Sequence, residues 1–214
     1  MALVLNGSAN TIGGLAVGGL PDGIVDTDMI AANAVTSNRI ALEGVTKDKQ
    51  GPGSIVQCLQ WTKSDTWSSS SANTWHSITG LVGLITPTTN TNKILIICSL
   101  GKFHNNAGSA AIRYDRTISG TGTTTSVGIG DAASNRPRVS FNTYGDDIYN
   151  DNHAGSYSHH YLDSPATTAE ITYQVKSNSE GTYAYLNRSS DDTDQDEVYR
   201  GRASSSLTLM EIVA

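Results

Sequence analysis

From residue 54 to the C-terminus, short hydrophobic runs alternate with clusters of Gly, Ser, Thr, Asn and Asp. Many short runs bounded by turn residues predict strands that pack as a sandwich or a barrel. No amphipathic helical pattern separates the runs, so βαβ units are excluded. We therefore expect an all-β domain, a jelly-roll-like β-sandwich in which two sheets protect each other's edges. The expected strands cover residues 54–62, 75–85, 93–103, 110–118, 127–130, 138–141, 156–162, 170–177, 182–187 and 204–212.

Two of these runs differ in their alternation. Residues 171–176 alternate apolar and polar side chains, which is typical of a sheet with one face in water. The run 94–98 (ILIIC) is apolar at every position, so both faces of that strand are hydrophobic. In a single sandwich the outward side chains of this strand would lie in water. We therefore expect contact with a second copy of the chain, and we assign Leu95 and Ile97 to that interface.

Residues 25–50 follow a ten-residue period: VDTDMIAANA, VTSNRIALEG and the truncated VTKDKQ. This period drifts around a helix, and half of it changes face on a strand. Each unit is therefore better explained as a short extended piece followed by one helical turn. One unit cannot bury its own Val and Ile, so parallel copies are expected to wrap a common axis as a short fibrous stalk. The predicted contact positions are Val25, Ile30, Val35, Ile40 and Val45.

Residues 1–24 are nearly free of charge and rich in Gly, with small apolar side chains at no clean period. Such a stretch loses much backbone entropy on folding. It is either a disordered tail or an extended docking segment that orders against a partner, for instance as an added strand. Its aliphatic content favours docking. The Gln50–Gly53 break (QGPG) ends the stalk, which predicts a docking segment at 1–24, a stalk and hinge at 25–53 and a head domain at 54–214.

The stalk sequence DGIVDTDMIAANAVTSNRIALEGVTKDK resembles the D-G-x-[VI]-x-T-x-x-I-A-x-x-A-V-T-x-x-x-I repeats of tail-fibre and appendage proteins of tailed bacteriophages. The matching positions are Asp22, Gly23, Val25, Thr27, Ile30, Ala31, Ala34, Val35, Thr36, Ile40 and Ala41. The opening MALVLNGSANTIGGLAVGGL resembles the start of phage fibre proteins. The stretches GDAASNRPRVSF, YLDSPATT and LNRSSDD are similar to the C-terminal β-domain of proteins in cyanophage and marine phage genomes.

This resemblance implies a subunit of a virion appendage, a short tail fibre. Its N-terminal segment would attach to other virion proteins, and its head would adhere to the host surface, with glycan as the expected ligand. Threefold symmetry suits both a rod of parallel chains and a jelly-roll head, so we expect a homotrimer. The alternative is a purely structural virion protein, such as a capsid decoration, head fibre or neck or collar protein, without a host ligand. Either would be found in the virion, after assembly in the host cytoplasm.

Composition limits the range of partners. The chain of 214 residues suits one domain with an extension. Its formal charge of −6 argues against a phosphate backbone as ligand, so no nucleic acid is expected. No apolar run approaches the roughly 20 residues that span a bilayer, so no membrane insertion is expected. The N-terminus lacks the positively charged start of a signal peptide.

Cys58 and Cys98 lie inside strand-like runs and are expected to be buried small hydrophobic residues. A disulfide is possible if the two strands are neighbours, but a cytosolic origin argues against it. Neither belongs to a Cys-x-x-Cys pair, so the cysteines give no support for a metal site.

The segment DIYNDNHAGSYSHHYLD gathers Tyr and His beside Asn and Asp, a combination that gives rigid amphipathic contact area. From it we assign Tyr149, Tyr157 and His159 as ligand-contacting residues. An ordinary polar loop with an edge strand would have the same composition, and so would a metal site. Against a metal, His159 and His160 point to opposite faces of a strand, and no third ligand can be placed.

Trp67 lies in a Ser-rich loop, whereas Trp61 and Trp75 lie in expected strands and are assigned to the core. We assign Trp67 as a ligand-contacting residue, an exposed platform on which a sugar could stack. The alternative is that its ring folds back onto the sandwich.

The acidic run 191–197 (DDTDQDE) alternates carboxylates as calcium loops do, but Glu197 stands where such a loop needs Gly. A solvated acidic loop is the expected structure, without a metal. The chain lacks the Gly-x-Ser-x-Gly, Walker and His-Glu-x-x-His motifs. A polysaccharide-cleaving enzyme needs two placed carboxylates, and neither this run nor Asp146 and Asp147 shows signs of burial. We expect no enzyme activity and no cofactor.

Overall fold

The computed structural model describes residues 4–6, 11–13, 35–36, 40, 49–105, 108–145, 154–180 and 183–214. The chain divides into two units, Met1–Lys49 and Gln50–Ala214, and the second is called the β-domain below. In the first unit, β1 (Val4–Asn6) pairs antiparallel with β2 (Thr11–Gly13). Of the predicted stalk contacts, Val25, Ile30 and Val45 lie outside the described residues.

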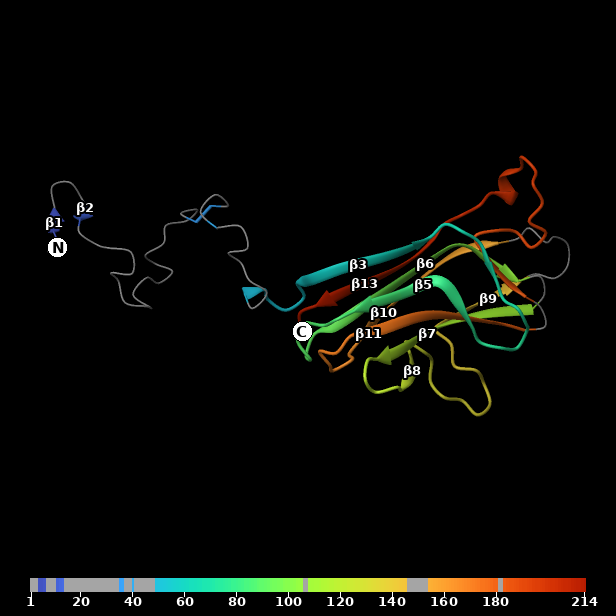
Figure 1. The fold of residues 1–214 in the computed structure, drawn as a ribbon, viewed down its shortest axis with the longest axis horizontal. Helices are drawn as coiled ribbons and strands as arrows, with labels where there is room; N and C mark the ends of the chain where they lie inside the picture. Colours follow the sequence, from blue (N-terminus) through green and yellow to red (C-terminus); the bar gives the residue numbers. More distant parts are fainter. Residues whose placement is uncertain are drawn as a thin grey trace. The chain divides into compact units, whose positions relative to one another are not determined.

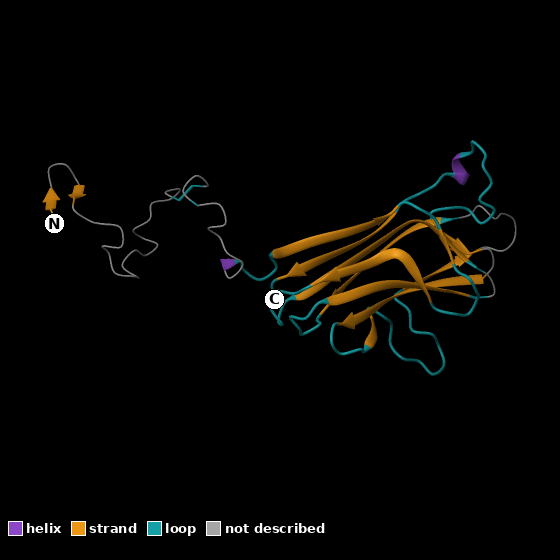
Figure 2. Ribbon diagram, viewed as in Figure 1, coloured by secondary structure: helices purple, strands orange, loops and turns teal. Residues whose placement is uncertain are grey.

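The β-domain consists almost entirely of strands and loops (Figure 2). A single turn of 3-10 helix covers Val198–Arg200. Among the described residues, no helix has the length and apolar character needed to cross a lipid bilayer. The strands are β3 (Ile55–Lys63), β4 (Trp67–Ser68), β5 (His76–Ile85), β6 (Lys93–Asn105), β7 (Gly108–Ile118), β8 (Thr124–Val127), β9 (Phe141–Gly145), β10 (Gly155–Asp163), β11 (Ile171–Ser179), β12 (Ala184–Leu186) and β13 (Ser205–Ile212).

The β-domain consists of two antiparallel sheets. The axes of the long strands in one sheet are nearly aligned with those in the other (Figure 1). The first sheet has the order β3-β13-β6-β10, and β12 with β4 extends it beside the far end of β6. The second sheet has the order β5-β11-β7-β8, and β9 also pairs with β7. The long strands, taken in chain order, therefore alternate between the sheets (β3, β5, β6, β7, β10, β11 and β13), and the last of them returns beside the first. This is the strand order of a jelly roll, which confirms the predicted fold class.

The core lies between the two sheets and follows the period of two that strands impose on side-chain direction. In β6 and β11, alternate side chains are fully buried, and they face the buried alternate side chains of β7 and β13. Burial of each such Leu or Ile side chain stabilises the fold by about 1.5–3 kcal/mol. The buried hydrophobic residues of these four strands are Ile94, Ile96, Cys98, Leu100, Phe103, Ala110, Ile112, Tyr114, Ile171, Tyr173, Val175, Leu207 and Leu209.

Most expected strands are found with small changes at their ends, but three differ and one was missed. The expected strand 127–130 is replaced by β8, which ends where Gly128 takes a φ of +62°. Its Thr124 pairs with Thr117, their hydroxyl oxygens 2.8 Å apart, so residues outside the expected strands form a strand. The expected strand 138–141 is replaced by β9, the one at 182–187 shortens to β12, and β4 was not predicted.

A buried ion pair connects the two sheets near the end of β10. Asp163 accepts two hydrogen bonds from Arg116 Nη1 on β7, at 2.9 and 2.8 Å. The same carboxylate accepts a hydrogen bond of 2.6 Å from the Tyr173 hydroxyl on β11. A buried carboxylate is tolerated only where it is paired and hydrogen-bonded, so these three side chains fix the separation of the sheets at this point.

Candidate functional site

The outward face of the first sheet carries a hydrophobic row across its full width. Strand register places Cys58 opposite Met210, Met210 opposite Leu95, and Leu95 opposite Leu162. The neighbours of Leu95 along β6, Ile94 and Ile96, are completely buried, so Leu95 points away from the core. Leu162 is 44% exposed. The row therefore places four apolar side chains, one from each strand, where a single chain leaves them partly in water.

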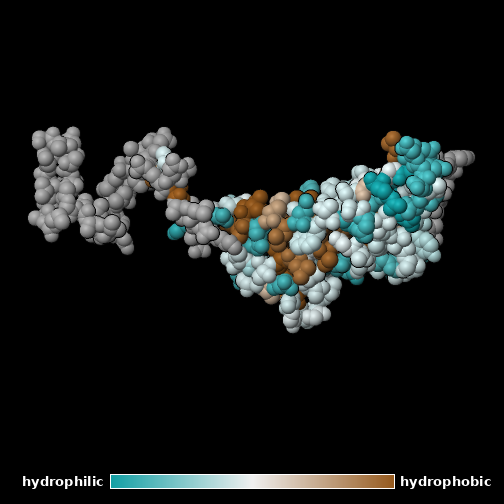
Figure 3. Space-filling view, turned by 45° about the horizontal axis from the view of Figure 1, so that its top comes forward, coloured by the Kyte–Doolittle hydropathy of each residue, from teal (hydrophilic) through white to brown (hydrophobic). Residues whose placement is uncertain are grey.

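Along the strands this face changes from apolar to polar. The next row contains Ile97 and His160 beside Gln60 and Thr208, and the row after it contains only Ser and Thr. Figure 3 shows hydrophobic residues gathered toward the end of the β-domain where β3 begins, and hydrophilic residues toward the opposite end. We call Cys58, Leu95, Ile97, Leu162 and Met210 the outer apolar face. Outward faces of antiparallel sheets are usually polar, so this one is suited to being covered.

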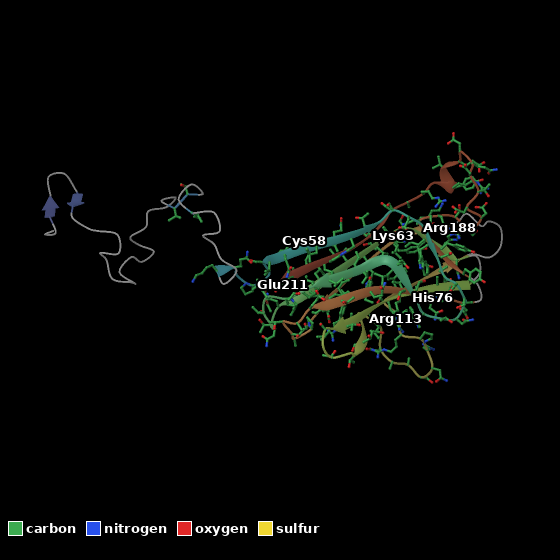
Figure 4. All side chains as sticks on the ribbon, in the orientation of Figure 1. Cys58, Lys63, His76, Arg113, Arg188 and Glu211 are labelled. Atoms are coloured by element: carbon green, nitrogen blue, oxygen red, sulfur yellow. The ribbon has the colours of Figure 1, made fainter. Side chains whose placement is uncertain are left out.

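Cys58 was expected to be buried, and this is wrong. It lies on the outward side of β3, at the edge of the first sheet (Figure 4), and it is exposed. Cys98 lies on the inward side of β6, and burial raises the pKa of its thiol to about 12. Both thiols are free. The two residues do not pair because Cys58 lies opposite Met210, whereas Cys98 lies opposite Leu207 and points into the core.

Trp67 and Tyr157, assigned above to ligand contact, both lie partly buried against the core. Trp67 is on β4, and Tyr157 is on β10 with its ring edge-on to Phe103, 6.4 Å between ring centres. Tyr149 falls outside the described residues. Contact between these residues and a ligand stays a prediction.

His159 lies on the inward side of β10, between the sheets. Its Nδ1 is 3.1 Å from the Tyr114 hydroxyl, and its ring stacks on Phe141 at 5.5 Å between ring centres. Burial and the neighbouring His160 lower the pKa of His159, which keeps the imidazole neutral at pH 7. Burial raises the pKa of Tyr114, so the tyrosine keeps its proton, and its hydroxyl and His159 Nδ1 share one hydrogen bond. The arrangement stabilises the interior rather than presenting His159 to solvent.

Trp75 is not part of the core, contrary to expectation. It precedes β5 and lies half-buried against the second sheet, where the guanidinium carbon of Arg113 lies 4.2 Å from the ring centre. Arg113 is on the outward side of β7, because its neighbours Ile112 and Tyr114 point inward. The three tryptophans are distinguished by tertiary packing, since Trp61 and Trp67 pack on the core whereas Trp75 packs under an arginine.

The acidic run 191–197 is largely neutralised by arginines from its own neighbourhood. Asp192 pairs with Arg188 at 3.3 Å and with Arg202 at 2.7 Å. Arg200 pairs with Asp191, and this hydrogen bond lowers the pKa of the Asp191 carboxyl. In the described parts of the chain, no three His, Cys, Asp or Glu side chains are placed to hold a metal ion. The run is an Arg-paired loop, and its carboxylates do not converge on one point.

The strand order thus defines the chain as a jelly-roll β-sandwich with a partly apolar outward face. No protein-family model matches the chain, and no curated protein matches it. Among solved structures, it is similar to VP2 of infectious bursal disease virus in a subviral particle, with 13% identity and a TM-score of 0.37 over 75% of this chain and 34% of that chain. A structure of the Gx strain of the same virus gives 12% identity and a TM-score of 0.33 over 75% and 43%. The chain spans about a third to two-fifths of the length of these proteins, and matches at this level place it in no family.

Proposed function

We propose that this chain is a structural subunit of a viral particle, and that it forms a homotrimeric appendage of the short-tail-fibre type. In this proposal the N-terminal segment attaches to other virion proteins and the repeat region forms the stalk. The β-domain is the head, and it adheres to the host surface through glycan. The proposal joins the self-association of the chain, argued from the β-domain, with the sequence resemblance of the repeat region.

The observation that carries the proposal is the outer apolar face. Its row of Cys58, Met210, Leu95 and Leu162 crosses every long strand of the first sheet. Removing apolar surface from water is favourable by about 25 cal/mol for each Å² buried. A second copy of the chain supplies the same face at the same concentration, and stable interfaces bury roughly 800 Å² on each partner. The face therefore favours contact between subunits.

The repeat region supports the same conclusion. Val35 and Ile40 occupy two of the predicted contact positions and are 56% and 43% exposed in the single chain. Aliphatic side chains exposed at repeat positions are available to pack against sister chains in a stalk. The phage-like repeat sequence then supports a virion appendage, and jelly rolls serve in both viral capsid and lectin domains.

The test is the mass of the full-length protein in solution by sedimentation velocity. A trimer has three times the 22.6 kDa chain mass. Leu95→Glu and Ile97→Glu place a charge in the outer apolar face and should shift the β-domain toward single chains. Thr172→Glu is the matched control, because Thr172 lies on the outward side of β11 in the second sheet and should leave the mass unchanged.

A wild-type protein that is folded and monomeric at micromolar concentration would overturn the trimer. A monomer whose outer apolar face is protected only when other virion proteins are added would instead support the structural alternative. In that case the face contacts a different subunit, and no host ligand is required.

A further inference from the structure

A hollow of about 340 Å³ lies over the outward side of the second sheet. Its floor is a row in register across three strands, with Asn178 of β11 opposite Ala111 of β7, and Ala111 opposite Asn142 of β9. Trp75 forms part of its wall, and Glu180 borders it. The hollow is on the sheet opposite the outer apolar face, so assembly through that face leaves the hollow free.

The Trp75 ring is held in place by charged groups that lie outside the hollow. Arg113 lies over the ring at 4.2 Å, a cation–π contact that fixes the ring plane. Arg113 is in turn paired with Asp115, 2.9 Å from its Nε, and Asp115 also pairs with Lys176 at 3.2 Å. Burial by itself raises the pKa of Asp115, but hydrogen bonds and ion pairs outweigh it and lower the pKa, so the carboxylate stays ionised. The ring is thus a rigid aromatic surface rather than a loose side chain.

Most of the polar side chains that line the hollow are amides rather than charged groups. Asn73, Asn142 and Asn178 supply three side-chain amides, each able to donate and to accept hydrogen bonds. Asn178 Oδ1 is buried and has no hydrogen-bond partner among the described residues. A buried acceptor without a partner destabilises a fold unless a donor reaches it, so a ligand hydroxyl group would favour rotation of the Asn178 side chain toward the hollow. Among the described residues of the wall, only Glu180 is charged.

We propose that this hollow binds one ring of a neutral sugar, with the C–H face of the ring against Trp75 and its hydroxyl groups on the three amides. An aromatic face with amide donors and acceptors matches the two-sided polarity of a sugar. The carboxylate of Glu180 disfavours an anionic ligand by like-charge repulsion. The volume is at the lower end of the range for small-ligand sites, which suits one or two rings.

This inference rests on the proposed function, since it supplies the glycan contact of the head. The hollow is open to solvent on one side, so a single site is expected to bind weakly, with a Kd of about 1 mM. The three sites of one trimer would together bind a glycan surface more tightly than a single site, because the first contact raises the effective concentration for the other two.

The test uses the full-length protein labelled with 5-fluorotryptophan, whose three resonances are assigned by single Trp→Phe variants. Glucose, galactose, mannose and N-acetylglucosamine are titrated to about 50 mM, well above the expected Kd. At least one of these sugars should shift the Trp75 resonance and leave those of Trp61 and Trp67 in place. N-Acetylneuraminic acid, which is anionic, should shift it less at equal concentration.

Variants are compared by saturation transfer from the protein to the sugar protons. Trp75→Ala should abolish the transfer, and Asn178→Ala should weaken binding about tenfold. Asn90→Ala is the control, an exposed Asn on the loop between β5 and β6. If no sugar shifts the Trp75 resonance in folded protein, or if Trp75→Ala binds as wild type does, the inference is overturned. The mass of the same sample separates the two proposals, because a trimer without sugar binding leaves the assembly standing and removes only the site.

Discussion

The Glu211 carboxylate on β13 accepts a hydrogen bond of 2.6 Å from the backbone amide of Thr88, on the loop between β5 and β6. Glu211 is completely buried near the end of β13 (Figure 4). It also accepts hydrogen bonds from the Thr88 hydroxyl at 2.7 Å, from Asn92 Nδ2 at 2.7 Å and from Gln57 Nε2 at 2.6 Å. One carboxylate therefore connects the loop that joins the two sheets to strands β3 and β13 of the first sheet.

Acid should weaken the β-domain through Glu211. Burial by itself raises the pKa of this carboxyl, but the hydrogen bonds from Thr88, Asn92 and Gln57 outweigh it, and the pKa lies below the ordinary value of 4.5. Because the folded-state pKa lies below that of the unfolded chain, the ionised carboxylate stabilises the fold at pH values above 4.5. This stabilisation is lost as the pH falls through the folded-state pKa. Denaturant unfolding at several pH values between 7 and 3 measures this loss.

Glu211→Gln is the comparison for that experiment. At pH 7 it should lower the free energy of unfolding by about 1–3 kcal/mol, because an amide nitrogen would face groups that are themselves donors. Its stability should also fall less steeply than that of the wild type between pH 4.5 and 3. Parallel pH profiles would show that Glu211 does not carry the dependence.

Substitution of Asn187 should lower the free energy of unfolding through two separable effects, the loss of hydrogen bonds and strain in the backbone. Its φ is +62°, and its Nδ2 donates to the carbonyl oxygens of Lys63 and Asp65, both at 2.9 Å. Asn187→Gly loses these hydrogen bonds but tolerates the backbone, whereas Asn187→Ala loses them and is strained as well. We expect Ala to be less stable than Gly by about 1–2 kcal/mol in urea unfolding. Equal stabilities would mean that the backbone relaxes at this position.

Gly83→Ala should destabilise the core by overpacking. A Cβ at Gly83 would lie 2.7 Å from Trp61 Cζ3 and 2.8 Å from Leu209 Cδ1. Both atoms belong to packed side chains, so the expected loss is about 1–3 kcal/mol in the free energy of unfolding. Gly130→Ala is the control, since nothing lies within 4 Å of a Cβ there. The packing argument is wrong if the two variants unfold at the same urea concentration.

The Arg116–Asp163 pair should behave as a buried ion pair in a double-mutant cycle. Asp163→Leu alone leaves the Arg116 guanidinium, only 18% exposed, without its carboxylate and should cost about 3–5 kcal/mol. Arg116→Met with Asp163→Leu removes both charges and should recover part of this loss. A simple sum of the two single effects in thermal unfolding would indicate that the charges act independently.

Cys58 provides an independent measure of the outer apolar face. In the folded protein Cys98 is buried and its pKa is raised to about 12, so only Cys58 should react with a thiol reagent at pH 8. If subunits cover the face, Cys58 should react at least about tenfold faster in Leu95→Glu than in wild type. Equal rates in both proteins would show that the face is uncovered in solution.

Local pattern explains the parts of the fold that could be predicted. Alternation at 171–176, the two-sided apolar run 94–98 and the turn residues between them determine which segments are strands, because side-chain direction in a strand depends only on its period. The same reasoning predicted that Leu95 and Ile97 lack cover in one chain, and the structure places Leu95 on the outward side. The threonines of β8 were missed because they follow a Gly-rich turn and gain their hydrogen bonds from a neighbouring strand.

The sequence by itself determined the all-β class, most strand positions and the doubly apolar character of β6. Only the tertiary structure decided that β13 returns between β3 and β6, that Cys58, Met210, Leu95 and Leu162 form one row, and that Trp67 turns inward while Trp75 packs beneath Arg113. The physical reason is that strand pairing and ring packing join residues far apart in the chain. Their free energies depend on all the alternatives that compete in the folded domain, and no local period records that competition.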